Sequence, residues 1–201
     1  MKLGELFKQV RDELEKRNVP YALAGGFVTS VYRKEPRATE DLDFFILANA
    51  HEEELATELI EFLGLTPHIV KKADLEGDPL FAIKKKNTPI NMVVGRSNEK
   101  PGLDFILSNI KWSTGVMERA QFNKIDFGFG PTPCLTVEDI LIAKFYSYKN
   151  SKTRFKDLDD IQSIFQAAHD LDFNYILGRM SELNLSIPAE VKESTPKELK
   201  G

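Results

Sequence analysis

Two aspartates separated by one residue, Asp41 and Asp43, are the side chains in this sequence best suited to chemistry. Four apolar residues follow them directly, which predicts a buried strand over residues 41–47. Alternate side chains of a strand share a face, so both carboxylates would point the same way. Like charges beside an apolar strand are stabilised by a cation, and Mg²⁺ suits paired carboxylates that leave room for phosphate oxygens. The alternative is an exposed strand end with two solvated acids.

A glycine pair precedes these acids in the sequence. Gly25-Gly26 lies between a short apolar run and a short helix predicted over residues 27–32. Glycine backbone can approach a ligand closely, and a helix N-terminus directs amides at anions. Arg37 and Thr39 add a cation and a hydroxyl just before the acids. Together these residues predict a site for a triphosphate and a metal ion, although a glycine pair by itself is usually only a turn.

A lysine occupies an apolar helical stripe farther along the chain. Val137, Leu141, Lys144 and Tyr148 share one helical face. An ammonium group there is stable if it reaches a phosphate or a carboxylate, or if it snorkels from the edge of the core. The charged cluster at 154–157 lies near a predicted helix start, where capping and surface pairing would explain it without a ligand.

These motifs resemble those of a known superfamily. The segment Ala24-Gly25-Gly26 … Arg37-Ala38-Thr39-Glu40-Asp41-Leu42-Asp43-Phe44 is similar to the signature of the DNA polymerase beta-like nucleotidyltransferases. The similarity is closer to the minimal bacterial branch, which includes the abortive-infection toxin nucleotidyltransferases. A second segment, from Val137 to Lys144 and from Arg154 to Asp160, resembles the "E-D-L … K … R-x-K-D-x-x-D" helical region of that branch.

The resemblance implies an enzyme that moves a nucleoside monophosphate from an NTP to an acceptor hydroxyl. Its catalytic residues would be Asp41, Asp43 and Lys144, with the two aspartates holding Mg²⁺ or Mn²⁺. The nucleotide would be bound by a further set of residues, namely Gly25, Gly26, Ser30, Arg37, Thr39 and Lys156. The acceptor could be RNA, a small molecule or a protein, and the expected protein partner is a cognate antitoxin-like protein.

The superfamily usually has a third carboxylate on a neighbouring strand. The strand predicted over residues 89–94 is the best candidate for that neighbour, and Asn91 is expected at the carboxylate position. An amide offers a metal one oxygen but no charge, and it cannot act as a base. Asp104 and Asp126 are candidate substitutes that lack the expected context. Asn91 therefore favours an alternative, a catalytically degenerate nucleotide-binding or regulatory protein of the same fold. A third hypothesis is a scaffold that only binds a partner.

The elements that must position these residues predict an α/β (α+β) fold. We expect a mixed sheet flanked by helices in residues 1–134, a C-terminal helical bundle in 135–187 and a polar, flexible tail in 188–201. Helices are predicted over residues 3–17, 51–63, 136–148, 155–168 and 172–183, and over much of 101–123. The predicted strands, besides those given above, cover residues 21–24 and 124–129, with a hairpin joining 81–85 to 90–94.

Composition excludes several classes of protein. The 201 residues are 42% hydrophobic and include 14 Phe, so wholesale disorder is excluded. The formal net charge of −4 excludes a basic protein that coats nucleic acid. A single cysteine, Cys134, forms no internal disulfide, and the longest apolar runs are too short to span a bilayer. The expected location is therefore the cytoplasm.

Overall fold

A five-stranded mixed sheet forms the centre of the computed structural model, which describes residues 2–47, 51–71 and 90–200. Its strand order is β1-β2-β5-β4-β3. The strands are β1 (Tyr21–Ala24), β2 (Asp41–Ile46), β3 (Thr66–Lys71), β4 (Ile90–Arg96) and β5 (Gly102–Ile106). β2 and β5 pair in parallel and the other pairs are antiparallel. The predicted fold class is confirmed.

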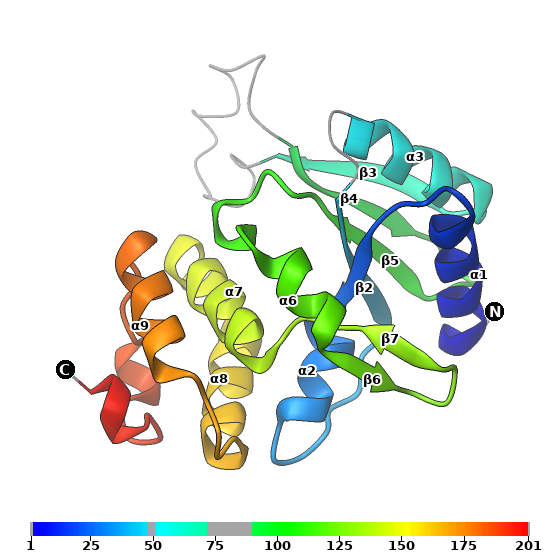
Figure 1. Cartoon of the computed structure of the whole chain (residues 1–201). Helices are drawn as coiled ribbons and strands as arrows, with labels where there is room; N and C mark the ends of the chain where they lie inside the picture. The colour runs from blue at the N-terminus through cyan, green and yellow to red at the C-terminus, as the bar shows by residue number, and fades with distance from the viewer. Residues whose placement is uncertain (1, 48–50, 72–89, 201) are drawn as a thin grey trace, which may run out of the picture.

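Two helices, α1 (Leu3–Lys16) and α3 (Glu52–Phe62), cover one face of this sheet (Figure 1). The apolar stripe of α1 is buried, because its spacing places one side of the helix toward the strands. Phe44 of β2 points into this layer, where its ring centroid lies 6.1 Å from that of Phe7 and 6.0 Å from that of Phe105. Since neighbouring residues of a strand face opposite ways, Asp43 faces the other side.

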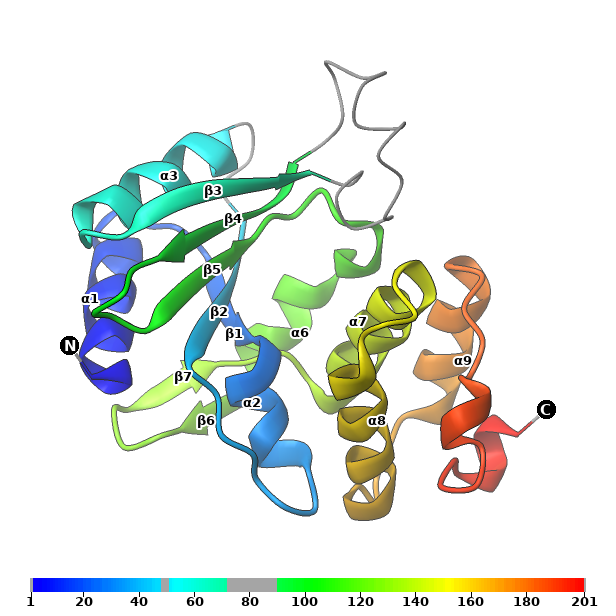
Figure 2. The same ribbon diagram turned by 180° about the vertical axis from the view of Figure 1, so that it is seen from behind.

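The remaining helices lie on that other side of the sheet (Figures 1 and 2). They are α2 (Gly25–Tyr32), α6 (Val116–Phe122), α7 (Val137–Asn150), α8 (Phe155–Ala167) and α9 (Phe173–Glu182). A 3-10 turn, η2 (Lys111–Ser113), brings Trp112 within 6.2 Å of Phe45, ring centroid to ring centroid. A small hairpin of β6 (Lys124–Asp126) and β7 (Pro131–Pro133) leads into α7.

Several expectations from the sequence differ from the structure. Residues 101–123, expected to be mostly helical, begin with β5 and contain helix only in η2 and α6. Strand β3 was not predicted, and the predicted strand over 81–85 lies outside the described residues. Residues 188–200 form two 3-10 turns, η3 (Ala189–Val191) and η4 (Lys197–Leu199), with Val191 and Leu199 buried. The tail therefore packs against the helices instead of extending into solvent.

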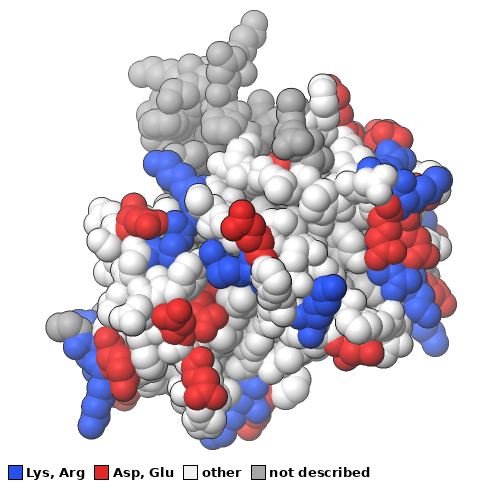
Figure 3. Space-filling view, in the orientation of Figure 1, with Lys and Arg blue, Asp and Glu red and all other residues white. Residues whose placement is uncertain are grey.

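Charged side chains of both signs are interspersed over the face seen in Figure 3, and neither sign forms one broad patch there. An anionic ligand on this face would therefore be held by a few local cations. No helix in the described part of the chain is long and apolar enough to cross a membrane.

Candidate active site: three carboxylates and a buried aspartate among cations

The two predicted acids lie on one face of β2, next to a third carboxylate. Parallel pairing of β2 with β5 sets Asp43 opposite Asp104 and Asp41 opposite Gly102. Asp104 is buried, whereas Asp41 and Asp43 are partly exposed to a cavity. The third acidic position of this site is thus Asp104, not the expected Asn91.

The prediction for Asn91 was wrong because β5 lies between its strand, β4, and the acid strand. The register of β3 with β4 passes from Val70 opposite Met92 to Lys71 opposite Ile90, so Asn91 is an extra, bulged residue. Asn91 is buried and lines the same cavity as the acids. Asn91 thus belongs to the lining of the cavity but does not take the place of the third carboxylate.

The sequence contains a signal for Asp104 that pattern reading missed. The tripeptide Leu-Asp-Phe occurs at residues 42–44 and again at residues 103–105. The two copies are register partners in the sheet, residue for residue. The repeat marks Asp104 as a candidate acid, but only the strand order shows that the two copies lie side by side.

Gly25 permits the close approach of α2 to the acids. Its φ is +58°, and a Cβ built on it would lie 1.9 Å from Oδ2 of Asp43, so a side chain is excluded. The helix α2 begins at this residue, and the backbone N–H of Gly26 bonds to the Asp43 carboxylate. A Cβ on Gly26 would lie 3.0 Å from Oγ1 of Thr39. The glycine pair thus fits closely against the acid strand.

Electrostatics at Asp43 reflect this crowding. Burial raises its pKa, and the nearby carboxylates of Asp104 and Asp41 raise it further, whereas the Gly26 N–H and Lys144 lower it; the resulting pKa is about 7. Burial also raises the pKa of Asp104, against the opposing effect of Arg96, which binds it. A cation placed among these carboxylates would relieve their repulsion.

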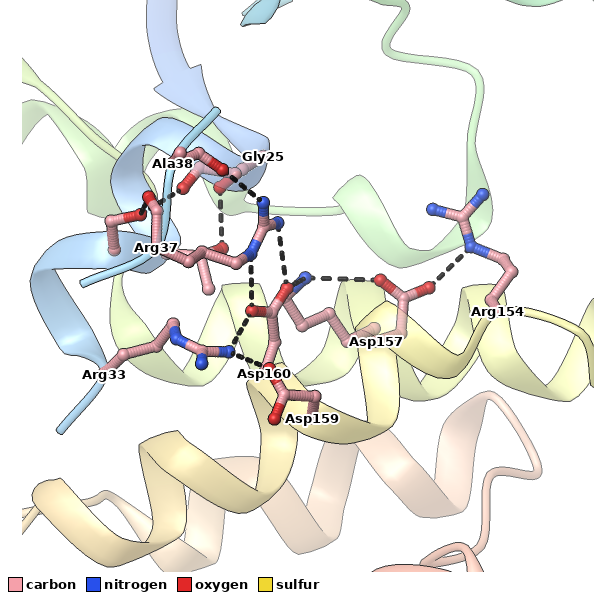
Figure 4. Close-up of polar contacts among 12 residues, drawn as sticks. Gly25, Arg33, Arg37, Ala38, Arg154, Asp157, Asp159 and Asp160 are labelled. Atoms are coloured by element: carbon pink, nitrogen blue, oxygen red, sulfur yellow. Dashed lines mark hydrogen bonds and ion pairs between the residues drawn. The ribbon is translucent and has the colours of Figure 1, made fainter. Parts of the chain in front are cut away.

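A second cluster surrounds Asp160, a completely buried side chain on α8 (Figure 4). Arg37 donates to it through Nε at 2.8 Å and Nη2 at 3.1 Å. Arg33 and Lys144 also bind it, Lys144 with an Nζ–Oδ2 distance of 2.6 Å. Although burial pushes the pKa of Asp160 upward, Arg37 and Lys144 lower it to about 2. This carboxylate therefore joins the segment before β2 to α7 and α8, and sequence reasoning had assigned it no role.

Lys144 is paired with two carboxylates of α8. Besides Asp160 it contacts Asp157, with 3.2 Å between Nζ and Oδ1, and Asp157 also binds Arg154. The ammonium group is therefore stabilised by carboxylates, which was one of the outcomes that its apolar stripe allowed. Arg37 and Lys144 still line the cavity that holds the acids.

This cavity has a volume of about 680 Å³ and lies between the acid face of the sheet and α7. Gly25, Gly26, Arg37, Thr39 and Lys156 all line it, as predicted for a shared site. An apolar wall, which the sequence did not reveal, is formed by Ile106, Ile110 and Trp112. The site thus combines acids, cations and apolar side chains in one cavity.

The two hydroxyl groups predicted to bind nucleotide, those of Ser30 and Thr39, donate hydrogen bonds to backbone carbonyls. Ser30 donates its hydroxyl to the carbonyls of Gly26 and Arg37, each at 2.9 Å, and does not line the cavity. Thr39 lines it but donates to the Asp41 carbonyl at 3.3 Å. Ser30 therefore fixes the turn between α2 and β2, while Thr39 holds the backbone of the first acid.

The donor set suits a hard divalent cation that is completed by its substrate. Among the described residues, no group of three or more His, Cys, Asp or Glu side chains forms a metal cage. Mg²⁺ is commonly bound by one or two carboxylates together with water and substrate phosphates. Asp41 and Asp43 offer such a pair, beside a glycine turn that lines the same cavity.

Comparisons with known proteins point to one family. The family model described as "Nucleotidyl transferase AbiEii toxin, Type IV TA system" matches residues 12–183. No curated protein matches the sequence.

Among solved structures, ANT(2")-Ia in complex with adenylyl-2"-tobramycin is similar, with a TM-score of 0.56 and 15% identity, over 90% of this chain and 95% of that one. The solution structure of the antibiotic-resistance factor ANT(2'')-Ia has a TM-score of 0.51 and 13% identity, over 89% and 87% of the two chains. An antigenic nucleotidyltransferase-like protein from Paracoccidioides brasiliensis has a TM-score of 0.47 and 19% identity, over 91% and 88%. The two ANT(2'')-Ia structures share the fold of this chain.

Proposed function

Because the chain belongs to the AbiEii family of nucleotidyl transferase toxins of type IV toxin–antitoxin systems, we propose that it transfers a nucleoside monophosphate from an NTP to an acceptor hydroxyl at Asp41 and Asp43. The observation that carries this proposal is Asp104, the register partner of Asp43. The alternative of a catalytically degenerate protein was based on an amide, Asn91, at the third acidic position. Because Asp104 lies at that position, this reason for the alternative no longer holds.

In this proposal Asp41 and Asp43 hold Mg²⁺ or Mn²⁺. The metal ion would neutralise charge on the triphosphate and favour departure of pyrophosphate. Asp104, next to Asp43, would be the third carboxylate, adding an oxygen ligand for the metal ion and accepting the proton of the acceptor hydroxyl as it attacks the α-phosphorus. The P–O bond to pyrophosphate breaks as the new bond to the acceptor oxygen forms.

Backbone and cationic groups would hold the triphosphate. Gly25 and Gly26 line the cavity beside the acids, and Arg37 and Lys144 line it as well. Their contacts with Asp160 fix both cations on one side of the cavity. Phosphoryl transfer depends on such positioning and charge stabilisation more than on covalent chemistry. Lys156, an exposed residue that also lines the cavity, would add charge at its edge.

The proposals for the acceptor and for the protein partner are based on the comparisons with known proteins. The ANT(2")-Ia structure is a complex with adenylyl-2"-tobramycin, which supports testing a small-molecule hydroxyl as the acceptor. RNA and protein hydroxyls are the other acceptors that we propose to test. The family description includes a toxin–antitoxin system, and a cognate antitoxin is accordingly the proposed partner.

The decisive experiment incubates the protein with each of the four NTPs and Mg²⁺ or Mn²⁺, together with total cellular RNA, aminoglycosides or protein. Pyrophosphate release and transfer of labelled nucleotide are measured. We expect one NTP to support transfer, and both Asp43→Asn and Asp104→Asn to abolish it. Asp170→Asn, at an exposed position outside the cavity, is the matched control and should retain full activity.

Binding measurements separate this proposal from its alternative. Metal-dependent NTP binding with no pyrophosphate release under any condition would favour the catalytically silent, nucleotide-binding protein. If no NTP binds with either metal, the partner-binding scaffold is the remaining hypothesis.

A further inference from the structure

An arginine holds the third carboxylate of the site. Arg96, the last residue of β4, binds both oxygens of Asp104; its Nη2 lies 3.1 Å from Oδ2, and Nη1 contacts Oδ1. Nη1 also donates to the Gly95 carbonyl at 2.9 Å. The Asp104 side chain is 10% exposed and that of Arg96 43% exposed. A buried carboxylate is thus paired, through both oxygens, with a guanidinium that reaches solvent.

Gly102 brings the same guanidinium close to the first acid. A Cβ on Gly102 would lie 2.0 Å from Oδ1 of Asp41 and 3.1 Å from Nη1 of Arg96, so both groups pass over this glycine. The hydrogen bond with Asp104 raises the pKa of Arg96, and the charges of Asp104, Asp41 and Asp43 raise it further. Arg96 therefore interacts electrostatically with all three carboxylates.

Other cations near the acids are engaged elsewhere. Lys144 is bound by Asp157 and Asp160, and Arg37 is bound by Asp160. Within the described part of the chain, Arg96 is the cation ion-paired with a member of the Asp41, Asp43 and Asp104 set.

We propose that Arg96 is a positioning residue that competes with the divalent cation for Asp104. The inference rests on the proposed function, because it concerns the metal site at the same acids. A bidentate guanidinium uses one lone pair on each carboxylate oxygen and repels a second cation on that carboxylate. Metal alone should consequently bind weakly, and firm binding should require the added negative charge and oxygen ligands of a triphosphate. Arg96 would thus link metal binding to nucleotide binding.

The test measures Mn²⁺ binding without nucleotide, by electron paramagnetic resonance of the free ion, in wild type and Arg96→Gln. Because a charge-assisted pair is equivalent to about a factor of ten or more in a binding constant, we expect the Kd of Arg96→Gln to be roughly tenfold lower. Adding a non-hydrolysable NTP analogue should tighten Mn²⁺ binding by a smaller factor in the variant than in wild type.

Arg119→Gln is the matched control. Arg119 binds both oxygens of the buried Asp139, at 2.9 and 2.6 Å, away from the cavity. Both glutamine variants should melt at a lower temperature in EDTA, since each leaves a buried carboxylate without its cation. Only Arg96→Gln should change the affinity for Mn²⁺.

If Arg96→Gln does not fold, Arg96→Lys takes its place, because lysine keeps the charge but cannot bind both oxygens of Asp104. Arg96→Lys should bind Mn²⁺ more tightly than wild type, by a factor smaller than the one expected for Arg96→Gln.

Unchanged or weaker Mn²⁺ binding by the folded variant would overturn the role of Arg96. If wild type binds Mn²⁺ in an Asp43-dependent way under those conditions, the proposed function stands and this inference alone fails. If neither wild type nor variant binds Mn²⁺, with or without the analogue, both fail.

Discussion

At Asp43, burial and two neighbouring carboxylates combine to favour the protonated form, with a pKa of about 7. The unfolded value is near 3.9, so the folded protein binds the extra proton between these limits, and stability falls as pH rises through that window. We expect wild type in EDTA to lose about 2 to 4 kcal/mol of unfolding free energy between pH 4 and pH 7 relative to Asp43→Asn. Urea unfolding at several pH values measures this difference.

The difference between the two proteins should level off above about pH 8, where both states of Asp43 are deprotonated. Mn²⁺ with NTP should restore wild-type stability at neutral pH and leave Asp43→Asn unchanged. Parallel stability curves for wild type and Asp43→Asn from pH 4 to pH 8 would show that Asp43 is not crowded by its neighbours.

Asp160 has the opposite linkage, since its pKa is lowered to about 2. Its contribution is present above the unfolded pKa and is lost as pH falls from about 4 toward 2. Asp160→Asn should lower the unfolding free energy at pH 7 by about 2 to 4 kcal/mol, because Arg33, Arg37 and Lys144 lose their shared partner.

The adjacent residue provides the control for this prediction. Asp159 binds Arg33 as well, but its side chain is 68% exposed, and Asp159→Asn should cost no more than about 0.5 kcal/mol. Equal losses in the two variants, measured by urea unfolding at pH 7, would contradict the central position of Asp160.

The combination of a glycine pair, Arg37, Thr39 and paired acids pointed to Asp41 and Asp43 from the sequence, although neither the acid pair nor the glycine pair is informative by itself. That combination could not identify Asp104, because the choice between Asn91 and Asp104 depends on which strand lies next to β2. Strand order is a non-local property, and a single polar residue in an apolar segment does not specify it. The contacts of Asp160 depend in the same way on three separate elements.

At the scale of elements, the start of α7 shows which part of the second motif is structural. Thr136 caps the helix by accepting the backbone N–H of Asp139, as the sequence predicted. Asp139 is buried and binds Arg119 and the hydroxyl of Tyr175, the latter at 2.6 Å. This carboxylate thus joins α6, α7 and α9 and does not line the cavity.

We therefore expect Asp139→Ala to destabilise the protein by about 2 to 3 kcal/mol, because it removes the buried carboxylate that binds the half-buried Arg119 and the Tyr175 hydroxyl. NTP affinity, measured well below the melting temperature, should be unchanged. Weakened NTP binding by the folded variant would instead place Asp139 in the functional machinery.

Amphipathic helices were predicted well because their stripes repeat over several turns, as in α1 and α8. The sequences of strands β3 and β5 lack a polar–apolar pattern clear enough to predict a strand. All five residues of β5 are buried, so it shows no alternation of exposure, and its short apolar run is equally compatible with a helix. Pro67 within β3 argues against a strand in sequence, yet β3 occupies an edge of the sheet, where proline is tolerated.

At the scale of the whole molecule, the C-terminal segment completes the helical layer. Val191 and Leu199 are buried, and the hydroxyl of Tyr148 donates to Glu190 at 2.7 Å. Leu199→Ala should lower the unfolding free energy by about 2 to 3 kcal/mol through loss of burial. The exposed Glu198→Ala should change it by less than about 0.5 kcal/mol.

Chemical denaturation of the two variants measures this difference. Limited proteolysis gives an independent check, since Leu199→Ala should be trimmed at its C-terminus sooner than wild type. If Leu199→Ala and wild type had the same stability and were trimmed at the same rate, the C-terminal segment would be a flexible tail, as the sequence predicted.

The β2–β5 pairing also has a consequence for synthesis on the ribosome. The glycine turn and first two acids are translated early, Asp104 follows much later, and Asp160 comes last of all. At 5–20 residues per second, translation from codon 41 to codon 160 takes roughly 6 to 24 s. Throughout that interval the nascent chain carries Asp41 and Asp43 without the buried anion that gathers Arg37 and Lys144. A message cut before codon 104 would yield only fragments whose acid strand lacks its parallel neighbour, so the site is assembled only after residue 160 has been synthesised.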